Sequence, residues 1–200
     1  MALIKSISGI RGTIGGTPGT SLTPVDIVKF AAAFGSIIQQ QHKDKFTATK
    51  VVIGRDGRMS GKMVRDLVCN SLIALGIDVI DLGLSTTPTV EIAVKMENAD
   101  GGIVLTASHN PKEWNALKLL NQEGEFISAD LGVKVLEKAA NESFFFTTVE
   151  KMGVITTNDT YLQKHVDAAV NYPMVNAKAI AKRNAMTPIA IPKPQALEPL

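Results

Sequence analysis

Residues 101–111 read Gly-Gly-Ile-Val-Leu-Thr-Ala-Ser-His-Asn-Pro. The apolar part, residues 102–106, predicts a buried strand, and the polar residues after it predict a loop at the end of that strand. Pro111 fixes its own φ angle and biases Asn110 away from helix, so we expect the turn to expose the hydroxyl of Ser108. A serine placed in this way is a poor core residue and a good candidate for a functional site.

After an initial strand, short apolar strands alternate with amphipathic helices on both sides of this stretch. The predicted strands are residues 50–54, 77–81 and 102–106, and the predicted helices are residues 24–42, 61–75, 87–96 and 128–141. The alternation predicts an α/β fold with a mixed, mainly parallel sheet sandwiched between helices. Ligands bind beyond the carboxyl ends of strands in such sheets. The loops at Arg55, Ser85 and Ser108 are therefore candidates for one shared site if their strands are neighbours.

Single residues mark where these helices begin and end. Thr23 is placed as the N-cap of the first helix with Pro24 at its first position, and Ser60 is placed to cap the second helix. Gly76 follows the second helix, where a glycine commonly ends a helix. Cys69 falls inside the second helix, and we expect it to have a packing role.

The pattern changes after the last of these helices. Residues 144–149 fit either a strand or a segment that packs between elements, and a helix with a mainly apolar side is expected further on. Residues 183–200 contain four prolines, which is incompatible with a long regular element. We therefore assign residues 1–157 to one α/β domain, and residues 158–200 to a linker helix and a proline-rich tail that is the truncated start of a second domain.

Composition limits the classes of function. Hydrophobic residues make up 45% of the 200 residues, which is enough for a substantial core. The net charge of +2 gives no reason to expect a nucleic acid or an anionic membrane as a partner. No apolar run is long enough to span a bilayer, and the N-terminus lacks the features of a signal peptide. One cysteine excludes an internal disulfide, and we expect a cytoplasmic protein.

Four segments carry a resemblance to a known family. The sequence Thr-Ala-Ser-His-Asn-Pro at residues 106–111 resembles the phosphoserine loop of the α-D-phosphohexomutases, which include phosphoglucomutases, phosphomannomutases and phosphoglucosamine mutases. Residues 8–12 resemble the family's N-terminal Gly-x-Arg-Gly signature, residues 54–58 match a further segment, and residues 115–118 resemble its Asn-Gly-x-Lys sequence. The resemblance extends over most of the chain and implies the N-terminal domain, domain I, of such an enzyme.

The resemblance implies a phosphohexomutase reaction and a role in it for four residues. Ser108 would carry a phosphoryl group and donate it to a hexose phosphate, which forms a hexose 1,6-bisphosphate and moves the group between O1 and O6. His109 would help with proton transfer or phosphate contact, Lys118 would be the general acid/base, and Arg11 would reach a phosphate. The implied cofactor is Mg²⁺, bound through a phosphate oxygen on Ser108.

The chain departs from the family pattern in two respects. Ala116 stands at the glycine of Asn-Gly-x-Lys: if that position has a positive φ, alanine costs energy, and otherwise the change is minor. The sequence also lacks the family's Asp-Gly-Asp-x-Asp-Arg magnesium loop, its Gly-Glu-x-Ser sugar loop and its later phosphate-binding loop. We therefore expect part of a longer enzyme that needs the remaining domains, is inactive alone, and does not itself select glucose, mannose or glucosamine.

Other interpretations remain beside this one. A non-catalytic phosphosugar-binding module that acts with a partner chain would not require an acceptor serine, and a Rossmann-type nucleotide binder would need a glycine fingerprint that the sequence lacks. Ser108 alone also fits a turn serine that satisfies backbone groups. Residues 54–58 fit a turn with a local Asp–Arg ion pair, although we favour a role in shaping the site over direct catalysis.

Overall fold

The computed structural model describes residues 2–6, 9–42 and 47–186. Contacts divide the chain into two units, residues 1–162 and 163–200, which are described separately. The strands are β1 (Leu3–Ser6), β2 (Gly9–Thr13), β3 (Lys50–Arg55), β4 (Asp78–Leu84), β5 (Gly101–Leu105), β6 (Trp114–Leu120) and β7 (Ile155–Thr157). The helices are α1 (Pro24–Gln41), α2 (Gly61–Ile73), α3 (Thr87–Met96), α4 (Ala129–Ala140), the 3₁₀ helix η1 (Val149–Lys151), α5 (Tyr161–Val170) and α6 (Ala177–Met186).

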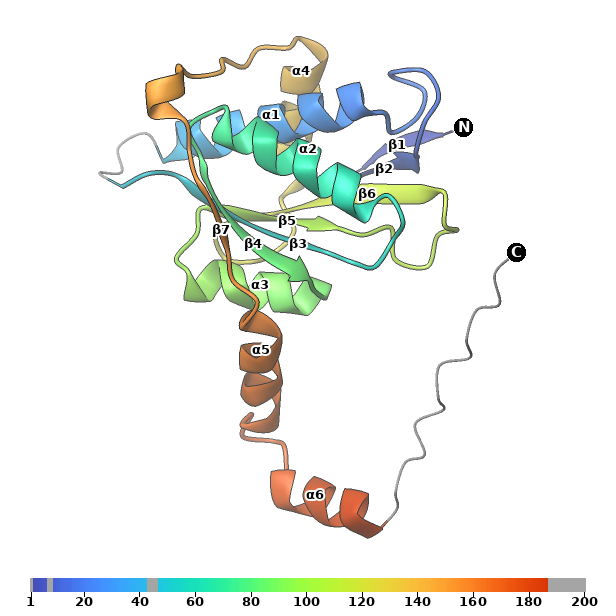
Figure 1. Cartoon of the computed structure of the whole chain (residues 1–200), viewed down its shortest axis with the longest axis vertical. Helices are drawn as coiled ribbons and strands as arrows, with labels where there is room; N and C mark the ends of the chain where they lie inside the picture. Colours follow the sequence, from blue (N-terminus) through green and yellow to red (C-terminus); the bar gives the residue numbers. More distant parts are fainter. Residues whose placement is uncertain (1, 7–8, 43–46, 187–200) are drawn as a thin grey trace. The chain divides into compact units, whose positions relative to one another are not determined.

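The first unit is built on one mixed sheet, as the sequence predicts. Among the described residues the sheet has seven strands in the order β1-β2-β6-β5-β3-β4-β7 (Figure 1). β3 pairs in parallel with β4 and β5, and β4 pairs in parallel with β7. β6 runs antiparallel between β5 and β2, and β1 is antiparallel to β2. Because β3, β4 and β5 are parallel neighbours, the loops after them leave the same edge of the sheet.

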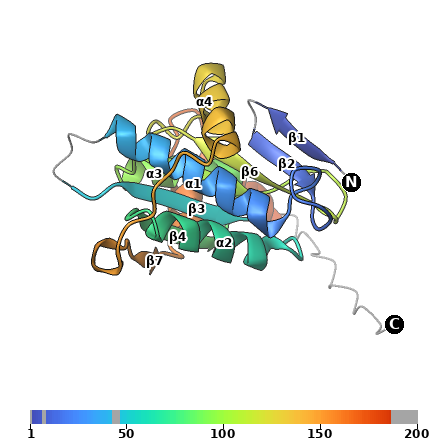
Figure 2. The ribbon, with the colours of Figure 1, turned by 90° about the horizontal axis from the view of Figure 1, so that it is seen from above.

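Helices cover both faces of the sheet, which confirms the predicted sandwich. α1, α2 and α4 lie on one face, and α3 lies on the other (Figures 1 and 2). The central strand β3 is buried on both sides: Val51 and Ile53 belong to the core shared with α1 and α2, whereas Val52 belongs to the core shared with α3. This division follows from the two-residue period of a strand.

Local capping agrees with the sequence in part. Thr23 and Asp26 form a capping box at the start of α1, in which the Thr23 backbone N–H donates to the Asp26 carboxylate (3.1 Å). Ser60 occupies the N-cap position of α2 but makes no capping hydrogen bond: its backbone is helical (φ −79°, ψ −6°) where a capping residue is extended, and its hydroxyl accepts from the Asn115 side chain. Gly76 follows α2 with a φ of 85°, a conformation that glycine adopts without steric cost.

Three parts of the fold differ from the prediction. β4 continues to Leu84, so the loop expected at residue 82 begins later. β1 and β2 form two strands where the pattern indicates one, and β7, with three residues, is too short to give a periodic signal. Residues 144–149 form no strand, and Phe144 packs against the core. The strand interpretation of that segment is therefore wrong, and the packing interpretation holds for Phe144 but not for the exposed Phe145, Phe146 and Val149.

The second unit contains the rest of α5, together with α6. α6 reaches residue 186, so the segment expected to be irregular begins with a helical turn. The prolines expected to exclude regular structure lie outside the described residues. Within the described part of the chain, no helix combines the length and the apolar character needed to cross a membrane.

Cys69 lies on α2 and is buried in the core shared with α1. Burial raises the pKa of its thiol to about 12, because a thiolate is poorly solvated there. The packing role expected from the sequence is confirmed.

We expect this thiol to be almost unreactive in the folded protein. A pKa of about 12 leaves about one thiolate in ten thousand thiols at pH 8, and the surrounding core also blocks access. Reaction with Ellman's reagent at pH 8 should be at least about a thousandfold slower in native protein than in protein unfolded in guanidinium, where the thiol has its ordinary pKa of about 8.5. Equal rates in the two states would contradict the buried position.

Candidate active site

Ser108 stands after the carboxyl end of β5 in an unusual backbone conformation. Its φ angle is 55°, in the left-handed region that residues other than glycine rarely adopt. Its N–H donates to the Thr106 hydroxyl (3.0 Å), and the Asn110 backbone N–H donates to the Ala107 carbonyl oxygen (3.1 Å). The Asn110 side-chain amide donates to the same carbonyl oxygen (2.7 Å). The resulting tight turn leaves Ser108 and His109 exposed, as the sequence predicts.

The four residues predicted for catalysis line one pocket of about 270 Å³. Ser108 and His109 come from the loop after β5, Arg11 comes from β2, and Lys118 comes from β6. The other lining residues are Gly9, Thr106, Ala107, Asn110, Ala116 and Phe126. The structure therefore gathers the four residues at one place, and their catalytic roles remain predictions.

The pairing of β2 with β6 places Arg11 and Lys118 on the same face of the sheet. Arg11 lies directly opposite Ala116, and Lys118 follows two residues later on β6. Leu117 and Leu119 face the other way, into the core shared with α1. On the face that carries Arg11 and Lys118, α3 packs against β3 and β5. The helix does not cover β2 and β6 there, and the pocket lies over these two strands.

The pocket offers cationic donors to a ligand. The Nε atom of Arg11 is buried and has no hydrogen-bond partner among the described residues, although buried polar groups are normally paired. The Lys118 and His109 side chains line the same space. A guanidinium and an ammonium together favour an anion, and a phosphate group has the size and the acceptor oxygens to use both.

Arg58, on the loop after β3, holds the Ser108 loop in place. Its guanidinium donates to the backbone carbonyl oxygens of Ser108 (2.8 Å), Asn110 (2.8 Å), Pro111 (2.8 Å) and Trp114 (3.0 Å), and its Nε–H donates to the Asp56 carboxylate (3.2 Å). A guanidinium has five N–H donors, and all five are used here. Arg58 thus connects the strained turn at Ser108 to the loop after β3.

The loops at this edge of the sheet contribute unequally. The ion pair of Arg58 with Asp56 that the sequence suggests is present, but most of the Arg58 bonds go to the Ser108 segment, which agrees with the expected shaping role. The Ser85 N–H donates to the Arg55 carbonyl oxygen (2.8 Å), which joins the loop after β4 to the end of β3. Of these three loops, only the Ser108 loop lines the pocket. The loops lie at the same edge of the sheet, but they do not form one shared site.

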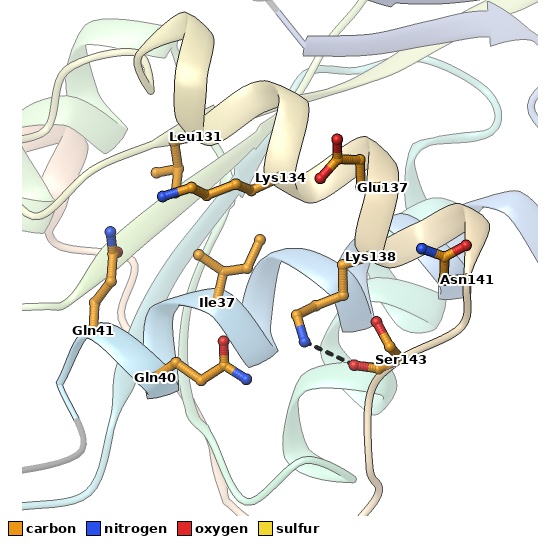
Figure 3. Close-up of a pocket in the computed structure, with 9 residues that line it drawn as sticks. All are labelled: Ile37, Gln40, Gln41, Leu131, Lys134, Glu137, Lys138, Asn141 and Ser143. Carbon is orange, nitrogen blue, oxygen red and sulfur yellow. Dashed lines mark hydrogen bonds between the residues drawn. The ribbon is translucent and has the colours of Figure 1, made fainter.

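A separate groove of about 390 Å³ lies between α1 and α4 (Figure 3). It is lined by Ile37, Gln40, Gln41, Leu131, Lys134, Glu137, Lys138, Asn141 and Ser143. The Lys138 ammonium already donates to the Ser143 carbonyl oxygen (2.7 Å). None of the residues predicted for catalysis lines this groove, so it is not part of the candidate site.

Comparison with known proteins agrees with this geometry. Residues 3–145 match the family model described as phosphoglucomutase/phosphomannomutase, alpha/beta/alpha domain I. The chain belongs to the phosphoglucomutase/phosphomannomutase family. The matched region contains every strand except β7, and all the pocket residues, so the pocket belongs to domain I of the family fold.

Relatives and solved structures support the same assignment. The chain is 35% identical over 174 residues to a phosphoglucomutase/phosphomannomutase of Thermococcus kodakarensis, covering 86% of the chain and 37% of that protein. It is 29% identical to a phosphoglucosamine/phosphogalactosamine mutase of Sulfurisphaera tokodaii, covering 92% of the chain and 38% of that protein. A crystal structure of a family protein from Burkholderia thailandensis superposes with a TM-score of 0.66 at 27% identity, covering 84% of the chain and 36% of that structure.

The alanine at the family's glycine position is accommodated without strain. Ala116 lies within β6, is 4% exposed, and is not among the described residues with a positive φ. The sequence leaves open whether this position has a positive φ, which would make alanine costly. The structure shows that it does not, so the change from glycine to alanine is minor. The Ala116 methyl group lines the pocket and makes it narrower than a glycine would.

The part of the chain that the structure describes offers few ligands to Mg²⁺. The described residues contain no group of three or more His, Cys, Asp or Glu side chains that could hold a metal ion. The pocket is lined by Arg11, His109 and Lys118, whereas Mg²⁺ prefers carboxylate, phosphate and water oxygens. The residues present do not fit the ion, and no step of the mechanism proposed below depends on it.

Two residues of the site region were given no role from the sequence. Phe126 lines the pocket and is 43% exposed, and Asn115 is fully buried with its side-chain amide donating to the Ser60 hydroxyl (2.9 Å). A phenylalanine within the polar turn after β6 was the available signal for Phe126. Asn115 belongs to the family segment at residues 115–118, but its bond to Ser60 gave no signal in the sequence, because Ser60 lies 55 residues away.

We expect Arg58→Lys to destabilise the protein and loosen the Ser108 loop. An ammonium cannot replace five donors in a planar fork, so the free energy of unfolding should fall by about 2–3 kcal/mol. Urea denaturation measures this change, and hydrogen exchange at the Asn110 amide reports the loop. The exposed Lys62, on α2, provides a control: Lys62→Gln should change stability by no more than about 0.5 kcal/mol. Equal stability of the two variants would contradict the role of Arg58.

We expect Ala116→Gly to lower the free energy of unfolding by about 1–2 kcal/mol. The substitution removes a buried methyl group and adds backbone freedom to the unfolded chain. Thermal and urea denaturation measure the change. The direction of the change in the free energy of unfolding tests the interpretation. If Ala116→Gly stabilised the protein, alanine would be strained at this position.

Proposed function

We propose that this chain is the phosphoryl-transfer domain of a phosphohexomutase, in which Ser108 accepts and donates the phosphoryl group. The observation that carries the proposal is the single pocket that unites the exposed Ser108 with Arg11, His109 and Lys118. Phosphoryl transfer depends mainly on positioning and on stabilisation of charge, and this pocket is suited to both. Membership of the family and the names of its relatives as mutases support the same class of reaction.

In the proposed reaction, a phosphoryl group moves between Ser108 Oγ and a hydroxyl of a hexose phosphate. The bond from phosphorus to Oγ breaks as the bond to the sugar oxygen forms, and Lys118 exchanges the proton of that hydroxyl. Arg11 binds a phosphate, and His109 contacts a phosphate or helps with the proton. The hexose 1,6-bisphosphate then returns its other phosphoryl group to Ser108, so that the net change moves phosphate between O1 and O6.

The geometry of the loop suits this role. A nucleophile that reacts repeatedly at one oxygen gains from being held in a fixed position, because less freedom is lost when the transition state forms. The bonds from Arg58 to both sides of the turn restrict the Ser108 backbone. The buried Arg11 Nε, which lacks a described partner, provides a donor for phosphate near that oxygen.

The complete activity requires more than this chain in our proposal. The chain spans 37% and 38% of the curated relatives described above. We infer that residues 1–157 act as domain I, that residues 158–200 lead into a second domain, and that further domains select the sugar and bind Mg²⁺. The partners are then hexose phosphates and the remaining domains. The alternative, a phosphosugar-binding module that works with a partner chain, uses the same pocket without phosphorylation of Ser108.

We expect Ser108 to carry the phosphoryl group. In the full-length enzyme, incubation with glucose 1,6-bisphosphate should add one phosphoryl group to Ser108, which intact and peptide mass spectrometry would locate. Ser108→Ala should abolish both this modification and mutase turnover, because it removes the hydroxyl that accepts the phosphoryl group.

Ser143, an exposed serine outside the candidate site, provides a matched control. Ser143→Ala should be phosphorylated on Ser108 and turn over like the unaltered enzyme. Full turnover by the Ser108→Ala enzyme would refute the proposal, and tight binding of the bisphosphate without any phosphorylation would favour the binding module.

A further inference from the structure

Phe126 is held beside the pocket by the turn that follows β6. The Asn121 side-chain oxygen accepts from the backbone N–H groups of Glu123 and Glu125, both at 2.9 Å. The Ile127 N–H then donates to the Leu119 carbonyl oxygen (3.1 Å), which returns the chain to β6. These bonds fix the backbone on both sides of Phe126, whose ring lines the pocket while remaining 43% exposed.

The ring of Phe126 lies against the ammonium group of Lys118. The Nζ atom is 5.9 Å from the ring centroid, within the range in which the negative face of an aromatic ring attracts a cation. Among the described residues, no carboxylate forms an ion pair with Lys118. The aromatic ring is therefore the partner that the structure provides for this charge.

An aromatic ring leaves the Lys118 ammonium free to bind an anionic ligand, whereas a carboxylate would not. A carboxylate would neutralise the ammonium and compete with a phosphate for it. A ring attracts the cation without accepting its strong hydrogen bonds, so the three N–H donors stay available. The lysine side chain has four rotatable bonds, and contact with the ring reduces the number of positions that the ammonium samples.

We propose that Phe126 is a positioning residue that holds the Lys118 ammonium in the pocket beside Ser108. The catalytic importance of this contact rests on the function proposed above, whereas the contact itself does not. Phe126 acts through Lys118, and it takes no part in bond formation.

The contact can be tested by NMR on the 200-residue chain with ¹³C-labelled lysine side chains. The signal of Lys118, assigned by its loss in Lys118→Arg, should lie upfield because of the ring current of Phe126. It should move to the position of exposed lysines in Phe126→Leu and remain upfield in Phe126→Tyr. Lys5, whose Nζ lies 5.7 Å from the Phe30 ring centroid, is an internal control that should not respond.

The effect on turnover is measured in the full-length enzyme. Phe126→Leu should lower kcat by roughly threefold to tenfold, corresponding to the loss of a cation–π contact, and Phe126→Tyr should restore it. The exposed Phe145 gives a matched control, because Phe145→Leu should leave both kcat and the Lys118 signal unchanged.

Each outcome separates this proposal from the proposed function. A Lys118 signal that does not respond to Phe126→Leu overturns the contact, and a lost contact with unchanged kcat overturns the positioning role. Failure of Ser108 to become phosphorylated overturns the proposed function, while the NMR result still decides whether the ring holds the ammonium.

Discussion

The site depends on one guanidinium that joins two loops. Arg58 lies in the loop after β3 and donates to three carbonyl oxygens in the segment that connects β5 to β6 and to the carbonyl oxygen of Trp114, the first residue of β6. Each acceptor belongs to the backbone, so the interaction constrains the path of the segment whatever its side chains are. A hydrogen bond from a charged donor contributes about 1.5–3 kcal/mol when its partners are otherwise unsatisfied, so this cluster can hold a turn that costs energy by itself.

That cost is visible at Ser108. A left-handed φ at a non-glycine residue is unfavourable by about 1 kcal/mol or more, and such conformations persist only where the surroundings impose them. Here the Thr106 hydroxyl, the Asn110 side chain and Arg58 impose it together. The result is an exposed hydroxyl on a fixed backbone. The bonds that stabilise the turn are thus also those that position the candidate nucleophile.

The rest of the pocket follows from the order of the strands. The antiparallel strand β6 lies between β5 and β2, which brings Lys118 and Arg11 to the same face as the Ser108 loop. On the opposite face the leucines on either side of Lys118 complete the core with α1. One strand therefore serves two purposes, because its two faces meet different environments: a packed helix layer on one side and an open pocket on the other.

The sequence by itself determined the α/β alternation, the exposed loop at Ser108 and the packing of Cys69, because these depend on local periodicity, on turn residues and on hydrophobicity. It also indicated, by resemblance, the four residues that meet in the pocket. Only the tertiary structure decided that Arg58 holds the Ser108 loop, that Ala116 is unstrained and that Phe126 faces Lys118. Backbone carbonyls accept in the same way at every residue, and the φ of one position depends on its strand pairing. The Arg58 contacts form only when segments about fifty residues apart in the chain are brought together by the order of the strands, and the contact of Phe126 with Lys118 depends on how the turn after β6 folds back.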